Sequence, residues 1–320
     1  MLDVFLTVDV EIWCDGWENI DEKFPAAYRK YIDGPTADGD YGLAYQLKVL
    51  SDHGLTGVFF VEPLFAARFG AQPLADIVGL IEAAGHEVQL HLHTEWVDEA
   101  TPPLLPDTTS KRQHMRYFSR ADQATLIRIG AAMLLQAGAR PVNAFRAGSF
   151  GFNRDTLLAL ADNAIAFDSS YNASMMGLDS GVMPGVRMTE PADCDGVHEY
   201  PMTVFDDGTR TLRHAQLTSC SSGEMEGLLW QAVEQGRSAF VVLSHCFELL
   251  NPAKNRVDPV VLARFHYLCA FLDKHRDVFC STGFHGLSPQ SCAMQPAPLA
   301  SSLYRTGLRM AQQAYRMRYQ

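Results

Sequence analysis

The sequence predicts an α/β protein whose parallel strands form a closed or nearly closed barrel. Short strand-like runs alternate with helix-like segments from end to end of the 320-residue chain, which indicates a parallel sheet covered by helices. These runs are apolar almost throughout, and this indicates strands that are buried on both faces. No glycine-rich phosphate turn follows the first strand, so the usual mark of an open dinucleotide-binding sheet is absent.

The first expected strand runs directly into two acids. From residue 2 onward, apolar residues fill an extended segment that ends in Asp9 and Glu11. Side chains two apart on a strand point the same way, so both carboxylates leave on one face, about 7 Å apart. Two acids placed like this repel each other unless a cation, an arginine or a shared proton compensates them.

The remaining elements follow the same alternation. Residues 13–39 are rich in Gly, Pro, Asp and aromatic residues and are expected to form a loop. Further strands are expected at 57–61, 87–93, 142–145, 165–167, 197–201, 239–243 and 278–282. Helices are expected between them, several ending at a glycine, at 43–54, 74–85, 126–138, 157–160, 224–235 and 260–271. The polar stretch 97–120 and the irregular stretch 169–195 interrupt the pattern.

Composition excludes some classes of function. The net charge of −11 argues against nucleic acid as a partner, because few basic residues are left over to neutralise phosphates. No apolar run has the length needed to cross a bilayer, and the N-terminus lacks the pattern of a secretory leader. Seven scattered cysteines without metal-finger spacing indicate free thiols in a reducing compartment. We therefore expect a cytoplasmic protein.

Residues that can do chemistry gather at the carboxyl ends of the expected strands, where parallel barrels carry their active sites. The strand bodies carry almost none of them, and this separation predicts an enzyme. The residues at the strand ends are Asp9, Glu11, His91, His93, Glu95, Arg146, Asp168 and His245.

The spacing of two histidines predicts a metal site. His91 and His93 share one face of a strand, and two imidazoles with a carboxylate such as Glu11 make a three-ligand site that leaves positions open for water. We expect a divalent metal there, with zinc as the first choice. Glu95 is the alternative ligand to His93.

Four segments in this order resemble a known family: Thr-Val-Asp-Val-Glu, Gly-His-Glu-Val-Gln-Leu-His-Leu-His, Phe-Arg-Ala-Gly and Leu-Ser-His. They are similar to the motifs of NodB-homology polysaccharide deacetylases, and most similar to the WalW-like branch associated with lipopolysaccharide biosynthesis. The resemblance spans about residues 2–285. It implies a distorted (β/α) barrel of about seven parallel strands. It also implies metal-assisted hydrolysis of acetyl groups on sugars.

Matched residue by residue, the resemblance implies four catalytic roles. Asp9 corresponds to the catalytic base and Arg146 to the arginine that pairs with it. His245 corresponds to the general acid, and Asp168 to an acid that tunes this histidine. The substrate would be an acetylated sugar, a polysaccharide or a lipopolysaccharide precursor, most simply an N-acetyl compound.

Two other functions stay open. Val10 stands where the family commonly has a metal-ligating aspartate, which favours a non-catalytic sugar-binding barrel. The same fold could also serve an amidase that acts on a small non-sugar amide. Aromatic residues in the stretch 13–39 favour a sugar, because sugar rings stack on aromatic faces.

The C-terminal part is expected to be separate from the barrel. We expect the barrel at 1–288 and, at 289–320, a proline-rich linker followed by a basic amphipathic helix. One stripe of this helix carries Leu299, Leu303, Met310, Ala314 and Met317, and the opposite face carries Arg305, Arg309 and Arg316. Such a helix can dock on its own protein or a second copy, or it can lie on an anionic membrane surface.

Overall fold

The computed structural model describes residues 1–107, 111–176 and 182–319. This chain divides into two compact units. Unit 1 consists of Met1–Gly57, Thr203–Thr282 and Ala297–Gln320, and unit 2 consists of Val58–Met202 and Gly283–Pro296.

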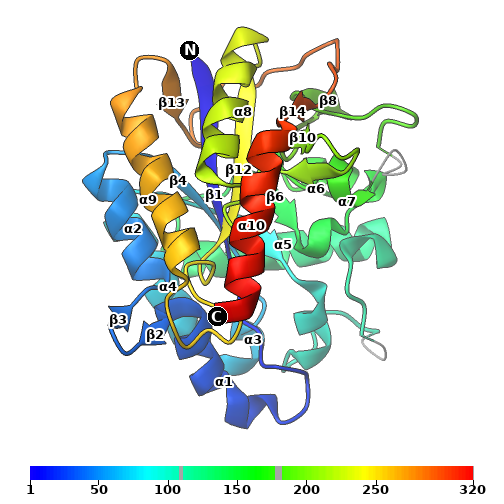
Figure 1. The fold of residues 1–320 in the computed structure, drawn as a ribbon. Helices are drawn as coiled ribbons and strands as arrows, with labels where there is room; N and C mark the ends of the chain where they lie inside the picture. Colours follow the sequence, from blue (N-terminus) through cyan, green and yellow to red (C-terminus); the bar gives the residue numbers. More distant parts are fainter. Residues whose placement is uncertain (108–110, 177–181, 320) are drawn as a thin grey trace. The chain divides into compact units, whose positions relative to one another are not determined.

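The centre of unit 1 is a set of three parallel strands. β1 (Leu2–Val10) pairs with β12 (Ala239–His245) on one side and with β13 (Phe279–Ser281) on the other, as Figure 1 shows. Apart from the half-buried Asp3, every residue of β1 is buried. This explains the continuous apolar run that the sequence shows, because a strand covered on both faces has no solvent side to keep polar.

Helices and short strands complete unit 1. Its helices are α1 (Ile20–Tyr28), the π-helix Arg29–Asp33, α2 (Leu43–Asp52), α8 (Ser222–Glu234), α9 (Pro259–Lys274) and α10 (Leu303–Tyr319). Its short strands are β2 (Pro35–Thr36), β3 (Gly39–Asp40), β10 (Val204–Asp206), β11 (Leu212–His214) and β14 (Leu299–Ala300). β2 and β3 form a hairpin, and β10 lies between β11 and β14.

Helix α1 corrects the expectation of a loop over 13–39. Ile20, Phe24 and Ala27 are buried at helical spacing, although Pro25 lies inside the helix. The apolar positions at i, i+4 and i+7 therefore predict the helix better than the proline and glycine content argues against it.

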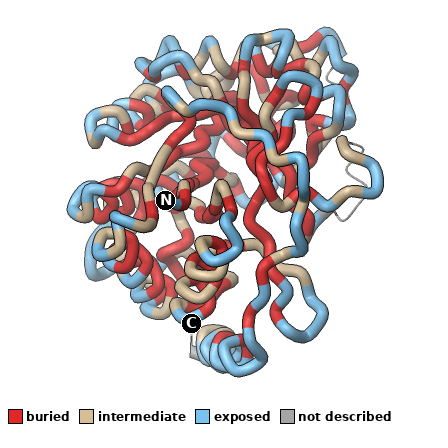
Figure 2. The backbone as a smooth tube through the Cα atoms, turned by 90° about the horizontal axis from the view of Figure 1, so that it is seen from above, coloured by how far each residue is buried: buried red, intermediate tan, exposed pale blue. Residues whose placement is uncertain are grey.

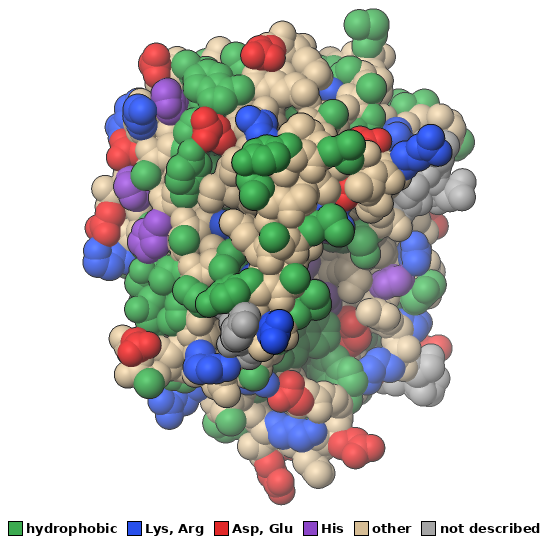
Figure 3. All heavy atoms as spheres, in the orientation of Figure 1, with side chains coloured by type: hydrophobic (Ala, Val, Ile, Leu, Met, Phe, Trp, Pro, Cys, Tyr) green, Lys and Arg blue, Asp and Glu red, His purple; other side chains and the backbone are tan. Residues whose placement is uncertain are grey.

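Helix α10 lies in the segment where an amphipathic helix was expected, and its buried arginines face the protein. Arg309 is buried and lies 3.0 Å from an Asp207 oxygen and 3.1 Å from a Glu224 oxygen. Arg316 lies 2.6 Å from Asp258. The large apolar residues of α10 are exposed instead, and in the space-filling view hydrophobic side chains gather over this helix (Figure 3). In Figure 2 the helical turns beside the C-terminal label are mostly exposed.

Unit 2 contains a longer run of parallel strands. The order is β4 (Gly57–Val61), β5 (Glu87–Leu92), β6 (Ala144–Ala147), β7 (Phe167–Asp168) and β9 (Val197–Glu199), and β8 (Ala192–Cys194) pairs antiparallel at the edge. Its α-helices are α3 (Ala66–Phe69), α4 (Ala71–Ala83), α5 (Arg120–Gln136), α6 (Arg154–Asp162) and α7 (Ala173–Met176). Its 3₁₀ segments are Thr94–Glu99, Met115–Tyr117 and Gly148–Phe150.

Strand β6 begins two residues later than expected, and the reason lies in Gln89. The backbone N–H groups of Asn143 and Ala144 donate to the Gln89 side-chain oxygen, at 2.9 and 2.8 Å. The chain therefore enters the sheet through a side-chain contact, and the regular ladder starts only at Ala144. As a result Arg146 lies within the strand and not in the loop after it.

Among the described residues, no helix combines the length and the apolar content that a membrane span requires. All seven cysteines are free thiols. The domain boundary near residue 288 stays a prediction.

Candidate functional site

In unit 1, the acids and the histidine predicted from strand ends lie together. Asp9 and His245 are paired Cα partners in the parallel ladder of β1 and β12. Glu11 follows the end of β1, and its Oε1 lies 3.9 Å from Nε2 of His245. Asp9 and Glu11 are both buried. The two strands thus place a carboxylate and an imidazole side by side at their carboxyl ends.

His245 is held by a carboxylate that the sequence analysis did not identify. Its Nδ1 lies 2.6 Å from Oε1 of Glu248, three residues further along the chain. Burial lowers the pKa of His245, but the hydrogen bond and charge of Glu248, with Glu11 and Asp9 nearby, outweigh burial and raise it to about 9. His245 therefore carries a proton at neutral pH. The amide of Gln216 donates to the same Glu248 oxygen at 2.5 Å, so the carboxylate is fixed from two sides.

The carboxylate that contacts His245 in unit 1 is Glu248, which lies in the turn directly after β12. The role of Asp168 toward this histidine stays a prediction. The spacing of three residues between the strand-end histidine and this carboxylate is the signal in the sequence that could have identified Glu248.

Glu11 is also oriented by an aromatic residue. The indole N–H of Trp13 donates to Oε1 of Glu11 at 2.9 Å, and Trp13 packs edge-on against Trp17 with ring centroids 6.2 Å apart. The aromatic stretch after β1 therefore contributes directly to the position of a site residue.

In unit 2, both predicted histidine ligands are buried at the end of β5 with Nδ1 engaged. Nδ1 of His91 lies 2.8 Å from the backbone oxygen of Arg146, and Nδ1 of His93 lies 3.4 Å from Oε2 of Glu95. The two rings are edge to face, with centroids 4.8 Å apart. Contacts of this kind fix the tautomer and the orientation of histidines that bind metals through Nε2.

Glu95 contacts His93, and a second acid nearby was missed. Glu62 follows the end of β4 and is fully buried, and it accepts the Leu64 backbone N–H at 2.8 Å. Burial raises the pKa of Glu62 to about 8. The position of Glu62 directly after an apolar strand was the same signal that identified Asp9, so the sequence analysis could have found it.

Arg146 is a fully buried cation in unit 2. Its guanidinium lies 4.2 Å from the centroid of the Phe60 ring, and its Nε donates to the backbone oxygen of Ser169 at 3.0 Å. In the strand ladder Arg146 is the Cα partner of His91. A buried cation of this kind needs a nearby negative charge.

Two buried acids supply that charge. Asp168 and Glu199 are Cα partners across β7 and β9, and both are fully buried. Burial, followed by the charge of Asp168, raises the pKa of Glu199 well above its usual value. Burial also raises the pKa of Asp168, whereas hydrogen bonds from Glu199 and Ser170 and the charge of Arg146 act in the opposite direction. The charge of Arg146 lowers the pKa of both acids, so it favours their ionised forms against burial.

Comparisons with known proteins concern the fold. No protein-family model matches this chain, and no curated protein matches it either. Among solved structures, the chain is similar to a Mycobacterium smegmatis protein described as a polysaccharide deacetylase, with 17% identity over 92% of this chain and 95% of that one, at a TM-score of 0.57. It is also similar to a 4-alpha-glucanotransferase from Thermococcus litoralis, with 10% identity over 91% of this chain and 41% of that one, at a TM-score of 0.53.

A third structure is a family 4 carbohydrate esterase from Streptomyces lividans in complex with acetate. It has 15% identity over 88% of this chain and 91% of that one, at a TM-score of 0.43. The two similarities above 0.5 establish the fold, and the fold class expected from the sequence, a distorted (β/α) barrel, is confirmed. Because one fold can host several chemistries, the activity has to be argued from the site. The resemblance to the NodB-homology polysaccharide deacetylases is thus confirmed at the level of the fold, and the WalW-like branch stays a prediction.

Proposed function

We propose that this protein is a metal-dependent hydrolase that removes acetyl groups, in the first instance N-acetyl groups, from a sugar, a polysaccharide or a lipopolysaccharide precursor. The observation that carries the proposal is His245, held protonated by Glu248 and paired in register with the buried carboxylate of Asp9. A protonated imidazole beside a carboxylate supplies the acid and the base that hydrolysis of an amide needs. The M. smegmatis protein with the same fold supports the choice of an acetylated sugar.

The donor set fits a divalent metal. Glu11, His91 and His93 can each offer one ligand atom, and two imidazoles with one carboxylate are typical of catalytic zinc sites. In unit 2 both imidazoles have Nδ1 engaged, which suits binding through Nε2. We propose these three residues as the ligands, with zinc as the expected ion. A metal bound there would polarise the acetyl carbonyl and lower the pKa of a bound water.

The chain's own residues supply the proton transfers. Asp9 takes a proton from the attacking water, and Arg146 is the residue expected to pair with it. His245 gives its Nε2 proton to the departing amine, while Glu248 at Nδ1 stabilises the cation before that step. Asp168 has an indirect role in this proposal, because it balances the charge of Arg146 together with Glu199.

Two alternatives predict different measurements. A sugar-binding barrel would bind an acetylated oligosaccharide without releasing acetate, and a small-amide amidase would hydrolyse a ureide-type amide in preference to a sugar. The retained acid and base argue against a purely binding role, since binding requires neither.

The first experiment measures acetate release from acetylated chito-oligosaccharides by purified protein of known metal content. Asp9→Asn keeps the shape of the side chain and removes the base, so the rate should fall by about 10²–10⁴-fold. The matched control is Asp76→Asn, an exposed acid on α4, which should leave the rate unchanged. Equal rates for Asp9→Asn and wild type would contradict the deacetylase mechanism and favour the alternatives.

We further propose that the exposed apolar face of α10 binds an anionic membrane surface. The exposed residues are Leu303, Tyr304, Leu308, Met310, Tyr315 and Met317. Of the four arginines of α10, Arg309 and Arg316 pair with acids of the protein, and Arg305 and Arg318 are the exposed ones that can attract an anionic surface. Cosedimentation with phosphatidylglycerol vesicles, and not with phosphatidylcholine vesicles, tests this proposal. Self-association measured by light scattering would assign the face to a second copy instead.

The seven free thiols support the cytoplasm as the compartment.

A further inference from the structure

A cavity of about 300 Å³ lies beside His245 in unit 1. Its wall includes His245, Phe247 and Glu248 from β12 and the following turn, Lys254 from the next turn, and Arg316 from α10. A volume of this size accommodates a substituent or one sugar unit and is far larger than a packing defect. Because the proposed general acid lies in its wall, a group bound in this cavity would be close to the reaction.

Most charges in this wall already have partners. The Glu248 carboxylate holds Nδ1 of His245, and the Arg316 guanidinium lies 2.6 Å from Asp258. Asp258 is buried and also caps the start of α9 by accepting the backbone N–H groups of Val260 and Val261. Arg316 is therefore committed to a fixed structural contact.

Lys254 is different. Its ammonium lies over two aromatic rings, 4.8 Å from the centroid of Phe247 and 5.0 Å from that of Tyr31. Within residues 1–107, 111–176 and 182–319, no carboxylate forms an ion pair with it. Asp15, the acid nearest in charge effect, is bound by Lys30 at 3.0 Å. Burial, and then the charge of Lys30, lower the pKa of Lys254, as expected of an ammonium that lacks full compensation.

The position of Lys254 is fixed by a strained turn. Its φ is 55°, a left-handed conformation that residues other than glycine rarely adopt. The turn is held by Asn251, whose backbone oxygen accepts the Lys254 N–H at 2.8 Å and whose side chain accepts the N–H groups of Asn255 and Arg256. A lysine kept at such a position, on the wall of a cavity, is presented there at an energetic cost.

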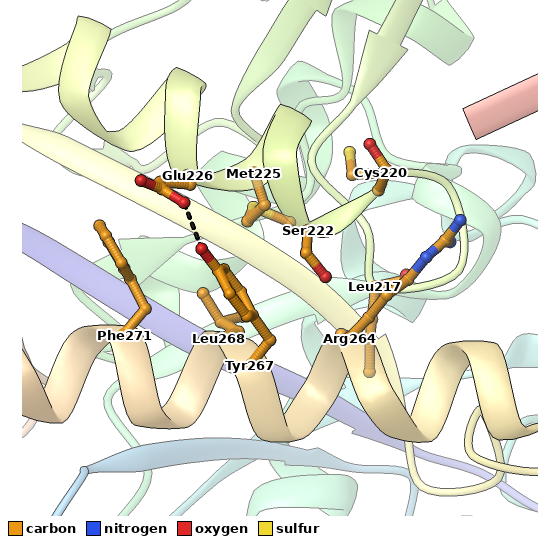
Figure 4. A pocket seen from close by; sticks show the side chains of 10 residues that line it. Leu217, Cys220, Ser222, Met225, Glu226, Arg264, Tyr267, Leu268 and Phe271 are labelled. Atoms are coloured by element: carbon orange, nitrogen blue, oxygen red, sulfur yellow. Dashed lines mark hydrogen bonds between the residues drawn. The ribbon is translucent and has the colours of Figure 1, made fainter. Parts of the chain in front are cut away.

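Two other cavities lined by described residues of unit 1 do not offer a comparable site. The cavity between α8 and α9 holds about 10 Å³, and its wall includes the hydrogen bond between Tyr267 and Glu226 (Figure 4). That volume is enough for one water at most. The cavity beside Met1 lies at the amino end of β1, away from the residues that carry the chemistry.

We propose that the cavity beside His245 binds an anionic substituent of the substrate, a carboxylate or a phosphate carried by the acetylated sugar, and that the Lys254 ammonium is the group that recognises it. This inference rests on the proposed function, because it names the substrate class of that site. The chain as a whole has a net charge of −11, so general electrostatic attraction would not concentrate an acidic sugar on it. Recognition has to come from a local cation, and Lys254 provides one. Phe247, which stacks on His245 with centroids 5.3 Å apart, would flank the same group.

The test measures binding by calorimetry with three probes of known charge. N-acetylglucosamine is neutral, N-acetylglucosamine 6-phosphate carries a phosphate, and N-acetylmuramic acid carries a carboxylate. The wild-type protein should bind at least one anionic probe about tenfold more tightly than the neutral probe, as one charge-assisted contact allows. This preference should weaken as the NaCl concentration rises. The anionic probe that is preferred identifies the substituent.

Variants assign the preference to one side chain. Lys254→Met keeps the length of the side chain and the strained backbone, and it should abolish the preference while leaving the affinity for N-acetylglucosamine unchanged. Lys254→Arg should retain the preference, and Lys48→Met, a change at an exposed lysine of α2, should have no effect. Equal affinities for the three probes in the wild type, or a preference that survives in Lys254→Met, would overturn the inference. Binding needs no turnover, so these results are independent of whether acetate is released.

Discussion

Nδ1 of His245 lies 2.6 Å from the carboxylate of Glu248, and this contact sets the charge of the histidine. Burial alone would make His245 neutral, since it disfavours the imidazolium. The acids around it reverse that effect and raise the pKa of His245 to about 9. The proposed general acid is therefore ready to donate a proton at neutral pH, where an ordinary histidine would be mostly neutral.

We predict that Glu248→Gln lowers the pKa of His245 to or below the ordinary histidine value of 6.5, because it removes the largest of the opposing contributions. The raised pKa stabilises the wild-type fold fully below pH 6.5, and this contribution is lost as pH rises through about 9. NMR titration of the His245 ring protons in metal-free protein measures the shift. Glu234→Gln, at an exposed acid of α8, is the control. An unchanged titration in Glu248→Gln would remove our account of the acid.

A second prediction concerns Arg146. Arg146→Met should reduce the free energy of unfolding by about 3–5 kcal/mol, because the buried carboxylates of Asp168 and Glu199 would then lack the cation that acts on both. Urea unfolding measures the change. Adding Asp168→Asn to Arg146→Met should restore part of the stability, since it removes the uncompensated charge. The single variant Asp168→Asn gives the reference loss in the free energy of unfolding. If Asp168→Asn caused the same loss in the Arg146→Met background, the two residues would be energetically independent.

Helix α10 gives a third prediction. Arg309→Met should destabilise unit 1 by about 3–5 kcal/mol, because it leaves the buried carboxylate of Glu224 without its cation and Asp207 with Arg213 alone. Arg305→Met, at an exposed position of the same helix, should cost less than about 0.5 kcal/mol. Equal stability of the two variants in urea unfolding would show that α10 is not anchored by the buried pair.

The pH dependence of stability provides an independent check on Asp207. Burial raises the pKa of Asp207, but hydrogen bonds from Thr209 and Arg213 outweigh it and lower the pKa to about 2. The depressed pKa stabilises the fold above pH 3.8, and this contribution should be lost as pH falls from 3.8 to about 2. Asp207→Asn should remove the part of the acid-induced loss that falls in this interval.

The residues that the sequence could identify are those whose position depends on local pattern alone. Asp9, His91 and His245 occupy strand ends, and an apolar run followed by a polar residue is enough to find them. The parallel alternation likewise predicts the fold class, because it reflects burial on both faces. None of this requires knowledge of which side chains meet.

The residues that were missed depend on contacts. Glu248 matters because the turn after β12 folds back on His245, and nothing in the strand pattern specifies that turn. In the sequence Glu199 is only a residue of a short strand, and the strand register is needed to show that it lies beside Asp168. The face that α10 turns toward the protein also depends on contacts. Its amphipathic pattern is visible in the sequence, but an apolar stripe normally faces the protein, and here buried acids attract the arginine face instead.

The last prediction separates the proposed metal ligand His93 from its neighbour Glu95. The Glu95 carboxylate lies 3.4 Å from Nδ1 of His93, a position that orients the imidazole. His93→Ala should therefore remove a ligand and abolish metal binding at stoichiometric concentration. Glu95→Gln keeps a hydrogen-bonding group and should weaken the affinity by only about 10–100-fold. Competition with a chromogenic chelator measures both affinities on the purified protein.

The measured affinities discriminate between a site that contains His93 and a site that contains Glu95, because each set predicts the larger loss of affinity for a different variant. If Glu95 were a ligand in place of His93, Glu95→Gln would abolish binding and His93→Ala would weaken it only modestly. His114→Ala provides a control, since this half-buried histidine lies outside both ligand sets and its loss should leave the affinity unchanged. Retention of metal in both His93→Ala and Glu95→Gln would place the ion elsewhere and remove the proposed site, because neither imidazole nor carboxylate of this pair would then be needed to bind it.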